Sequence, residues 1–252
     1  MRNVMLFAAL LSPMAMAQSL SVEPHSLMRL PVNAGAVTLE RLDVADYATV
    51  LVPGNLSEIT IGQLKMGHEA RIAIVPNRQE LTLRVHDAQM ASGSEILARG
   101  APGTFEKAPS PGRNLTLRIH RLQADELVLD ARGGSGAPGF AGLDGGYGRP
   151  AGCLWGAASR GADGDNGGNG REGGAGALVR LQVPSTLATE AIKVRVDGGA
   201  GGAPGAGGKP GKGGAGKNCL VYQAKSGKAG RAGQPGQPGA TGAPGNLILQ
   251  RL

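Results

Sequence analysis

Residues 227 to 245 read GKAGRAGQPGQPGATGAPG, with glycine at every third position. The same spacing occurs in three earlier runs, at residues 133–148, 161–176 and 199–214. A period of three is that of the polyproline-II helix, and glycine along one edge lets neighbouring backbones approach closely enough to hydrogen-bond. At about 3.1 Å per residue, each run would form a rod roughly 50–60 Å long. The spacing therefore predicts four rods of similar length rather than a flexible linker.

The links between the runs indicate how the rods pair. Residues 149–160 join the first two runs and residues 217–226 join the last two, and each link holds one cysteine, Cys153 or Cys219. If each pair of runs forms an antiparallel hairpin, the two cysteines lie at corresponding far ends, where a disulfide would tie the tips together. In the chain-entropy model such a cross-link contributes on the order of 4 kcal/mol. Two free thiols, or pairing between chains, remain the alternative.

Collagen is the obvious rival for residues 227–245, but the runs are short, three of them carry extra glycines, and strand-like segments interrupt them. An intramolecular antiparallel bundle fits these features better than a triple helix. In period and composition, residues 133–245 resemble the snow-flea antifreeze proteins and the polyglycine-II tips of phage tail-fibre adhesins. The resemblance implies a bundle of polyproline-II (polyglycine-II) helices in a secreted, glycine-rich, collagen-like protein. It also implies ice binding as a less favoured function, which the lysines of the last two runs argue against.

A second repeat lies outside the glycine runs. One strand motif recurs six times, and its first three copies start 22 residues apart. A second, shorter strand follows each of the first five copies, and the insertions between repeats grow along the chain at one corner. The six copies of the first motif begin at Val37, Ile59, Leu81, Leu115, Leu178 and Leu247.

The predicted fold class is an all-β scaffold with an inserted antiparallel polyproline-II helix bundle. The scaffold is β-solenoid-like, with stacked coils and loops that leave at one position; a β-sandwich is the alternative. The predicted parts are a signal peptide (1–17), an N-terminal extension or cap (18–36), a scaffold (37–132, completed by 177–197 and 246–252), and glycine hairpins at 133–176 and 198–245.

The start of the chain predicts export. Arg2, the apolar stretch from Val4 to Leu11 and the small residues Ala15 to Ala17 match the three parts of a secretory signal peptide. No other stretch is apolar for the roughly 18 residues that a membrane helix needs. We therefore expect no membrane span and a secreted or cell-surface protein, with the periplasm as another location.

The charge of the chain is concentrated in its second glycine hairpin. The whole chain has a formal net charge of +7, and residues 198–245 contain six basic residues and no acid. Such a patch indicates an anionic polymer as a partner, with nucleic acid bound only non-specifically. The basic patch consists of Lys209, Lys212, Lys217, Lys225, Lys228 and Arg231.

The links hold much of the scarce aromatic content of the chain. These side chains form either a hydrophobic plug that closes the bundle or an exposed contact patch for a sugar, surface polymer or protein. The tip contact candidates are Tyr147, Leu154, Trp155, Leu220, Val221 and Tyr222.

The last strand motif ends the chain without a following second strand, which leaves an open edge. The apolar N-terminal segment either caps its own scaffold or adds a strand to the open end of another copy. The assembly candidates are Leu20, Val22, Leu27, Leu30, Leu247 and Leu249.

No catalytic motif, cofactor motif or metal-ligand spacing is evident. His86 and His120 occupy equivalent places in two repeats, while His25 and His68 show no evident partner. Asp163, Asp165 and Asn166 lie close together, but they lack the terminal glutamate of a calcium loop.

The sequence thus predicts a non-catalytic structural or adhesive protein that forms or decorates an extracellular assembly, such as a filament, matrix or surface adhesin. Its partners would be other copies of itself and cell-surface or matrix polymers. The alternative is a protein that binds lipopolysaccharide, extracellular DNA or acidic polysaccharide through the lysine-rich hairpin.

Overall fold

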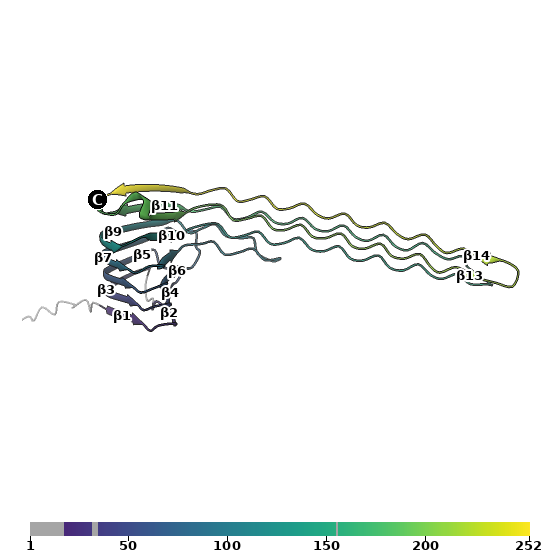
Figure 1. The fold of residues 1–252 in the computed structure, drawn as a ribbon, viewed down its shortest axis with the longest axis horizontal. Coiled ribbons are helices and arrows are strands. Elements are labelled where there is room, and N and C mark those ends of the chain that lie inside the picture. Colours follow the sequence, from purple (N-terminus) through teal and green to yellow (C-terminus); the bar gives the residue numbers. More distant parts are fainter. Residues whose placement is uncertain (1–17, 32–34, 155) are drawn as a thin grey trace, which may run out of the picture.

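The computed structural model describes residues 18–31, 35–154 and 156–252. The predicted signal peptide lies outside these residues. The described chain forms a body of two large β-sheets, from which long glycine-rich segments project to a distant tip (Figure 1). Apart from a short 3-10 turn, η1 (Thr189–Ala191), the described residues contain no helix.

The larger sheet contains the first strand of each repeat, and all its neighbouring strands are parallel. Its strands, in spatial order, are β1 (Gln18–Val22), β3 (Ala36–Val44), β5 (Glu58–Met66), β7 (Leu81–Met90), β9 (Leu115–Ala124), β11 (Leu178–Val183) and β15 (Asn246–Arg251).

The smaller sheet contains the second strands and is also parallel. Its strands, in spatial order, are β12 (Ile192–Arg195), β10 (Leu127–Asp130), β8 (Glu95–Leu97), β6 (Arg71–Ile74), β4 (Thr49–Val52) and β2 (Leu27–Arg29). A third, two-stranded antiparallel sheet of β13 (Lys217–Asn218) and β14 (Gln223–Ala224) lies at the tip (Figure 1).

The core lies between the two large sheets. Alternate residues of each strand point inward, and equivalent inward residues of neighbouring strands are in register, as Leu83, Leu117 and Leu181 are in β7, β9 and β11. Leucine, isoleucine and valine fill these columns and are almost completely buried. The alternation of apolar and polar residues in the sequence therefore sets which face of each strand is buried.

The predicted fold class is wrong. A β-sandwich is excluded because both large sheets are parallel, and a regular solenoid is not formed because only the first repeats have a constant length. The glycine runs are not an inserted helix bundle either, since no helix is assigned in them. They run as extended segments that are joined to one another by backbone hydrogen bonds. The described fold is two large parallel sheets with extended glycine segments.

The four glycine segments (133–148, 161–176, 199–214 and 227–245) lie side by side and share hydrogen bonds at every third residue. The second segment bonds to all three others, and so does the third, whereas no bond joins the first to the fourth in the described chain. The second and third segments therefore occupy the middle of a four-membered bundle. Their glycines contact neighbouring carbonyls on several sides, which leaves no room for a side chain.

Side chains of the second segment add a further row of bonds to the fourth. The Oδ1 atoms of Asp163, Asn166 and Asn169 accept hydrogen bonds from the backbone N–H groups of the fourth segment, at 2.7 to 2.8 Å. Asp163 and Asn166, two of the three residues considered above as a calcium loop, therefore hold two segments together. The donors are the N–H groups of Arg231, Gln234 and Gln237. Donors and acceptors both recur at every third residue, so the two rows match.

A shorter insertion, residues 100–112, braces the base of the bundle. The Gly103 N–H donates to the Ser135 carbonyl at 2.7 Å, and the Phe105 ring stacks on Phe140 with 4.2 Å between ring centroids. Arg171 also donates to the Phe105 carbonyl at 2.7 Å. The insertion thus contacts the first and second segments and ties them to the body.

A buried carboxylate lies where the first glycine segment leaves the body. Asp130 is 1% exposed and lies 2.7 Å from Arg99, 2.9 Å from Arg132 and 3.9 Å from Arg195. Burial raises the pKa of Asp130, but hydrogen bonds from Arg132 and Arg99 outweigh it, so the pKa lies below its usual value. The carboxylate therefore connects three strands of the smaller sheet, because Arg99 follows β8, Arg132 follows β10 and Arg195 lies in β12.

Asp130→Asn is expected to lower the free energy of unfolding by about 3 kcal/mol at neutral pH, because it leaves three arginines around an uncharged buried group. Because the pKa of Asp130 is lower in the folded than in the unfolded protein, its ionised carboxylate stabilises the fold at pH values above the unfolded pKa of about 3.9. This stabilisation is lost as the pH falls through the pKa of the folded protein. Urea unfolding at neutral and acidic pH measures both effects. The variant should show less acid destabilisation than the wild type, and the exposed pair variant Asp87→Asn should change stability less. Equal loss in the two variants would contradict this role for Asp130.

Candidate functional site at the rod tip

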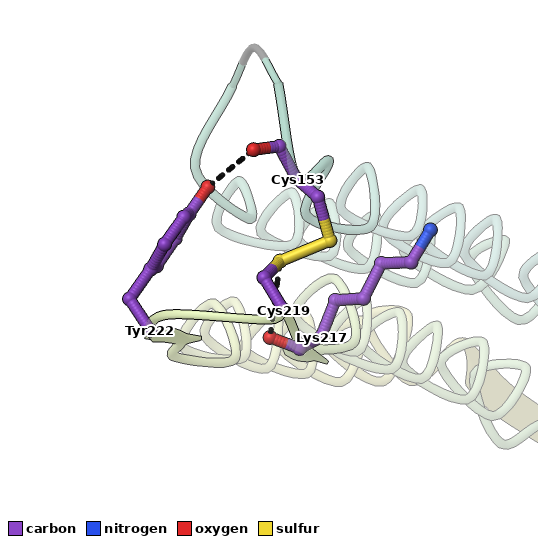
Figure 2. Close-up of a disulfide and its surroundings, with 4 residues drawn as sticks. All are labelled: Cys153, Lys217, Cys219 and Tyr222. Atoms are coloured by element: carbon purple, nitrogen blue, oxygen red, sulfur yellow. Dashed lines mark hydrogen bonds between the residues drawn. A yellow bond between two sulfur atoms is a disulfide. The ribbon is translucent and has the colours of Figure 1, made fainter.

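The predicted disulfide is confirmed. Cys153 and Cys219 form a disulfide with a Cα–Cα distance of 5.7 Å and a sequence separation of 66. The bond joins the link between the first two glycine segments to the link between the last two (Figure 2). The two hairpin ends therefore form one cross-linked tip.

The second link is a tight hairpin because β13 and β14 pair with only four residues between them. The Cys219 N–H donates to the Tyr222 carbonyl at 2.9 Å, which closes the turn. The Tyr222 hydroxyl reaches across and donates to the Cys153 carbonyl at 2.7 Å (Figure 2). Tyr222 is thus a second connection between the two links, beside the disulfide.

The aliphatic tip candidates project into solvent. Leu154 and Val221 are 88% and 92% exposed, and Leu220 is fully exposed. Tyr147 is exposed on the first segment, and Tyr222 is half exposed. Trp155 lies outside the described residues. An internal plug would bury these side chains, so their exposure favours the contact-patch interpretation.

The basic patch lies in the outer part of the same bundle. All six of its residues are exposed. In the described part of the chain, none of them is within ion-pair distance of an acid. Lys217 and Lys225 lie closest in sequence to the turn, and Figure 2 shows Lys217 beside the disulfide. The tip therefore combines exposed aliphatic side chains with free cations.

Two acids near the basic patch, Asp144 and Asp163, form hydrogen bonds or ion pairs within the bundle. Asp144 Oδ1 accepts a hydrogen bond from the Lys209 N–H at 2.7 Å, and Asp163 Oδ1 lies 2.6 Å from the Arg160 guanidinium. These contacts occupy carboxylate oxygens without neutralising the lysine side chains of the patch. The positive charge of the second hairpin thus faces solvent.

The assembly candidates lie at the two ends of the sheets. Val22 and Leu30 are buried and Leu20 packs against the core, while Leu27 is exposed. Leu247 and Leu249 are exposed on β15, the last strand of the larger sheet. The Asn246 and Leu252 N–H groups donate to the carbonyls of Ala177, just before β11, and Val183, at its end. The alternation of a parallel ladder therefore turns the Leu247 and Leu249 N–H groups outward. Assembly through this edge stays a prediction.

The structure brings together aromatic residues that the sequence left without partners. The His25 ring stacks on Tyr47 with centroids 4.9 Å apart, and Tyr47 meets His68 edge-on at 5.5 Å. Tyr47 lies 22 residues after His25, so the period of the repeat could have revealed the stack. His86 and His120 also lie in adjacent strands, with ring centroids 5.5 Å apart.

A polar groove crosses the outer face of the larger sheet, with a volume of about 320 Å³. Its walls include the ion pairs Arg41–Asp43 and Arg121–Asp87, with Lys65 between them. The Arg121 hydrogen bond lowers the pKa of Asp87. The two acids are paired with arginines and are therefore poorly suited to general acid–base chemistry.

Within residues 18–31, 35–154 and 156–252, no three His, Cys, Asp or Glu side chains are grouped as metal ligands, and no helix is long and apolar enough to cross a membrane. No protein-family model matches the chain, and no curated protein is similar to it.

Proposed function

We propose that this protein is a non-catalytic structural or adhesive protein of the cell exterior, which presents its tip to a partner at a fixed distance from the sheet body. The disulfide supports a location outside the reducing cytoplasm, either secreted, on the cell surface or in the periplasm. The partner would be a cell-surface or matrix component.

The observation that carries this proposal is the exposure of Leu154, Leu220 and Val221 on a cross-linked tip. Apolar side chains gathered in one exposed place mark a surface that is buried in a complex. The tip lies at the end of the bundle farthest from the sheets (Figure 1). Its position allows contact with a large surface without obstruction by the body.

The bundle suits presentation because it is held by hydrogen bonds along its whole length. A flexible glycine linker would let the tip sample many positions and lose that freedom on binding. Here bonds recur from Gly136 near the body to Gly214 near the tip. These hydrogen bonds therefore keep the tip at a fixed distance from the sheet body.

Binding of an anionic polymer is a second candidate function. The six exposed cations of the second hairpin favour it, because they are available to phosphate, sulfate or carboxylate groups. Such binding would weaken steeply with added salt, whereas contact through the aliphatic side chains would not.

The double variant Leu220→Ser, Val221→Ser is expected to lose at least about tenfold in adhesion of the full-length protein to whole bacterial cells, since it removes apolar contact area. Neither residue is buried, so the fold should persist. Leu143→Ser is the control, because Leu143 is also an apolar residue that is largely exposed, at 74%, but it lies on the first segment away from the turn. Labelled protein retained on washed cells measures the effect. Adhesion by the double variant equal to that of the wild type would refute the proposal.

A further inference from the structure

We propose that the partner of the tip is a lipid bilayer with anionic headgroups, into which the aliphatic turn residues insert. This inference rests on the proposed function, because it names the target of the same tip. Four properties of the tip support it: the aliphatic character of its most exposed side chains, the order of apolar and cationic residues, the excess of cations, and a shape that is already fixed by the disulfide.

The two most exposed residues of the turn are aliphatic. Leu220 and Val221 are the two central residues of the turn between β13 and β14, and Leu154 lies in the other link beside Cys153. Sugars are usually gripped by aromatic faces, and anionic polymers need only cations. Exposed leucine and valine serve neither role, but they suit acyl chains.

The cations lie behind the aliphatic residues in the chain. Lys217 and Lys225 flank the turn on either side, and Lys212, Lys228 and Arg231 follow toward the body. A membrane-surface anchor has this order, with apolar side chains about 5–10 Å below the headgroups and lysines at headgroup level. Tyr222 is half exposed and has an apolar ring with a polar end, which also suits the interface.

The charge around the turn matches an anionic surface. The second hairpin carries six cations and no acid, and these cations make no ion pair with any acid in the described chain. Each lysine near an anionic membrane strengthens binding by about fivefold. The attraction acts on the same end of the molecule as the aliphatic residues, so the two contributions reinforce each other.

The tip is already held in shape before it meets a membrane. The disulfide and the Tyr222–Cys153 hydrogen bond connect the two links, and β13 pairs with β14. Insertion therefore requires little ordering of the chain, and the hydrophobic contribution is not offset by a large entropy cost.

The test is co-sedimentation of the full-length protein with sucrose-loaded vesicles. Vesicles of equal parts phosphatidylcholine and phosphatidylglycerol are compared with phosphatidylcholine alone, and soluble polyphosphate serves as the anionic polymer. We expect binding to the anionic vesicles, with a partition coefficient that falls about a hundredfold in Leu220→Ser, Val221→Ser, or about tenfold for each side chain. Leu143→Ser should bind as the wild type does.

Variants of the lysines beside the turn form the second part of the vesicle test. Lys217→Gln with Lys225→Gln should weaken binding to anionic vesicles by about tenfold or more, while Lys217→Arg with Lys225→Arg should retain it. Polyphosphate binding should depend on the lysines but not on Leu220 and Val221. Vesicle binding that is insensitive to the two serines would overturn the inference in favour of a polymer-binding tip.

The same variants separate this inference from the proposed function. If adhesion to cells requires Leu220 and Val221 but the vesicles are not bound, the tip is adhesive and its partner is not a lipid bilayer. If neither cells nor vesicles are bound, both proposals are refuted.

Discussion

Gly205→Ala is expected to disrupt the glycine bundle and to leave Cys153 and Cys219 partly reduced. An alanine Cβ at this position would lie 1.8 Å from the Phe140 carbonyl oxygen, a backbone atom of the first segment. The Gly205 N–H also donates to the Gly168 carbonyl at 2.9 Å, and its own carbonyl accepts from Gly236 at 2.9 Å. One methyl group would therefore separate the third segment from its neighbours.

We expect the variant to lose about 3 kcal/mol or more of stability, the upper range for overpacking, because no side chain can move aside to relieve the contact. Two measurements apply: protection of the bundle from proteolysis, and titration of free thiols after purification under oxidising conditions. The thiol titration is informative because the disulfide forms only when the two links meet.

Gly146→Ala is the matched control for Gly205→Ala. Gly146 lies on the first segment, and an added Cβ there would have no atom within 4 Å. The substitution should leave stability unchanged or raise it by up to about 1 kcal/mol through the unfolded chain. Wild-type protease resistance and complete disulfide formation in Gly205→Ala would show that the segments are not packed as described.

Arg113→Met is expected to have the largest effect in the sheet body. Arg113 is completely buried, and its guanidinium donates to the carbonyls of Gln79 at 3.1 Å, Val75 at 3.2 Å, and Leu56. Burial lowers the pKa of Arg113, but an arginine starts so high that it stays charged at neutral pH. The side chain thus satisfies carbonyls of three loop positions that would otherwise be buried without donors.

Methionine has a similar length but no donor, so three carbonyls would lose their hydrogen bonds. Each unsatisfied buried acceptor costs about 1–3 kcal/mol, and we expect a loss of about 3 kcal/mol or more. Urea unfolding measures this as a lower midpoint with an unchanged slope. Arg113→Lys should recover only part of the loss, because an ammonium cannot copy the planar fork of the guanidinium.

The control for this variant is Arg78→Met, which removes an exposed arginine in the neighbouring loop. It should change stability by less than about 0.5 kcal/mol. If the two arginine variants unfold at the same urea concentration, the buried hydrogen bonds of Arg113 do not stabilise the body.

Much of the strand content was predictable because the motif recurs with a strand period. The motifs beginning at Leu81, Leu115 and Leu178 lie in β7, β9 and β11. Their apolar positions are the buried ones except at Leu178, because Val179 is the residue in register with Leu115. The disulfide was predictable because each link between glycine runs holds one cysteine. Both inferences use local features, which a linear sequence displays directly.

Arg113 and Asp130 could not be recognised in the same way. Each lies among many exposed arginines or acids, and nothing beside it in the sequence marks it as buried. The acceptors of Arg113 are up to 57 residues away in the sequence. Asp130 lies in β10 and meets Arg195 in the neighbouring strand β12. Only the folded chain brings such groups together.

The sequence by itself determined where the strands, the glycine segments and the disulfide lie, because hydrophobic alternation, a period of three and a pair of cysteines are local patterns. The tertiary structure alone decided that both sheets are parallel and that the second and third segments occupy the middle of the bundle. It also decided that Leu154, Leu220 and Val221 face solvent instead of closing the tip. These outcomes depend on backbone hydrogen bonds between distant residues, whose partners are the same N–H and C=O groups at every position and therefore leave no mark in the sequence.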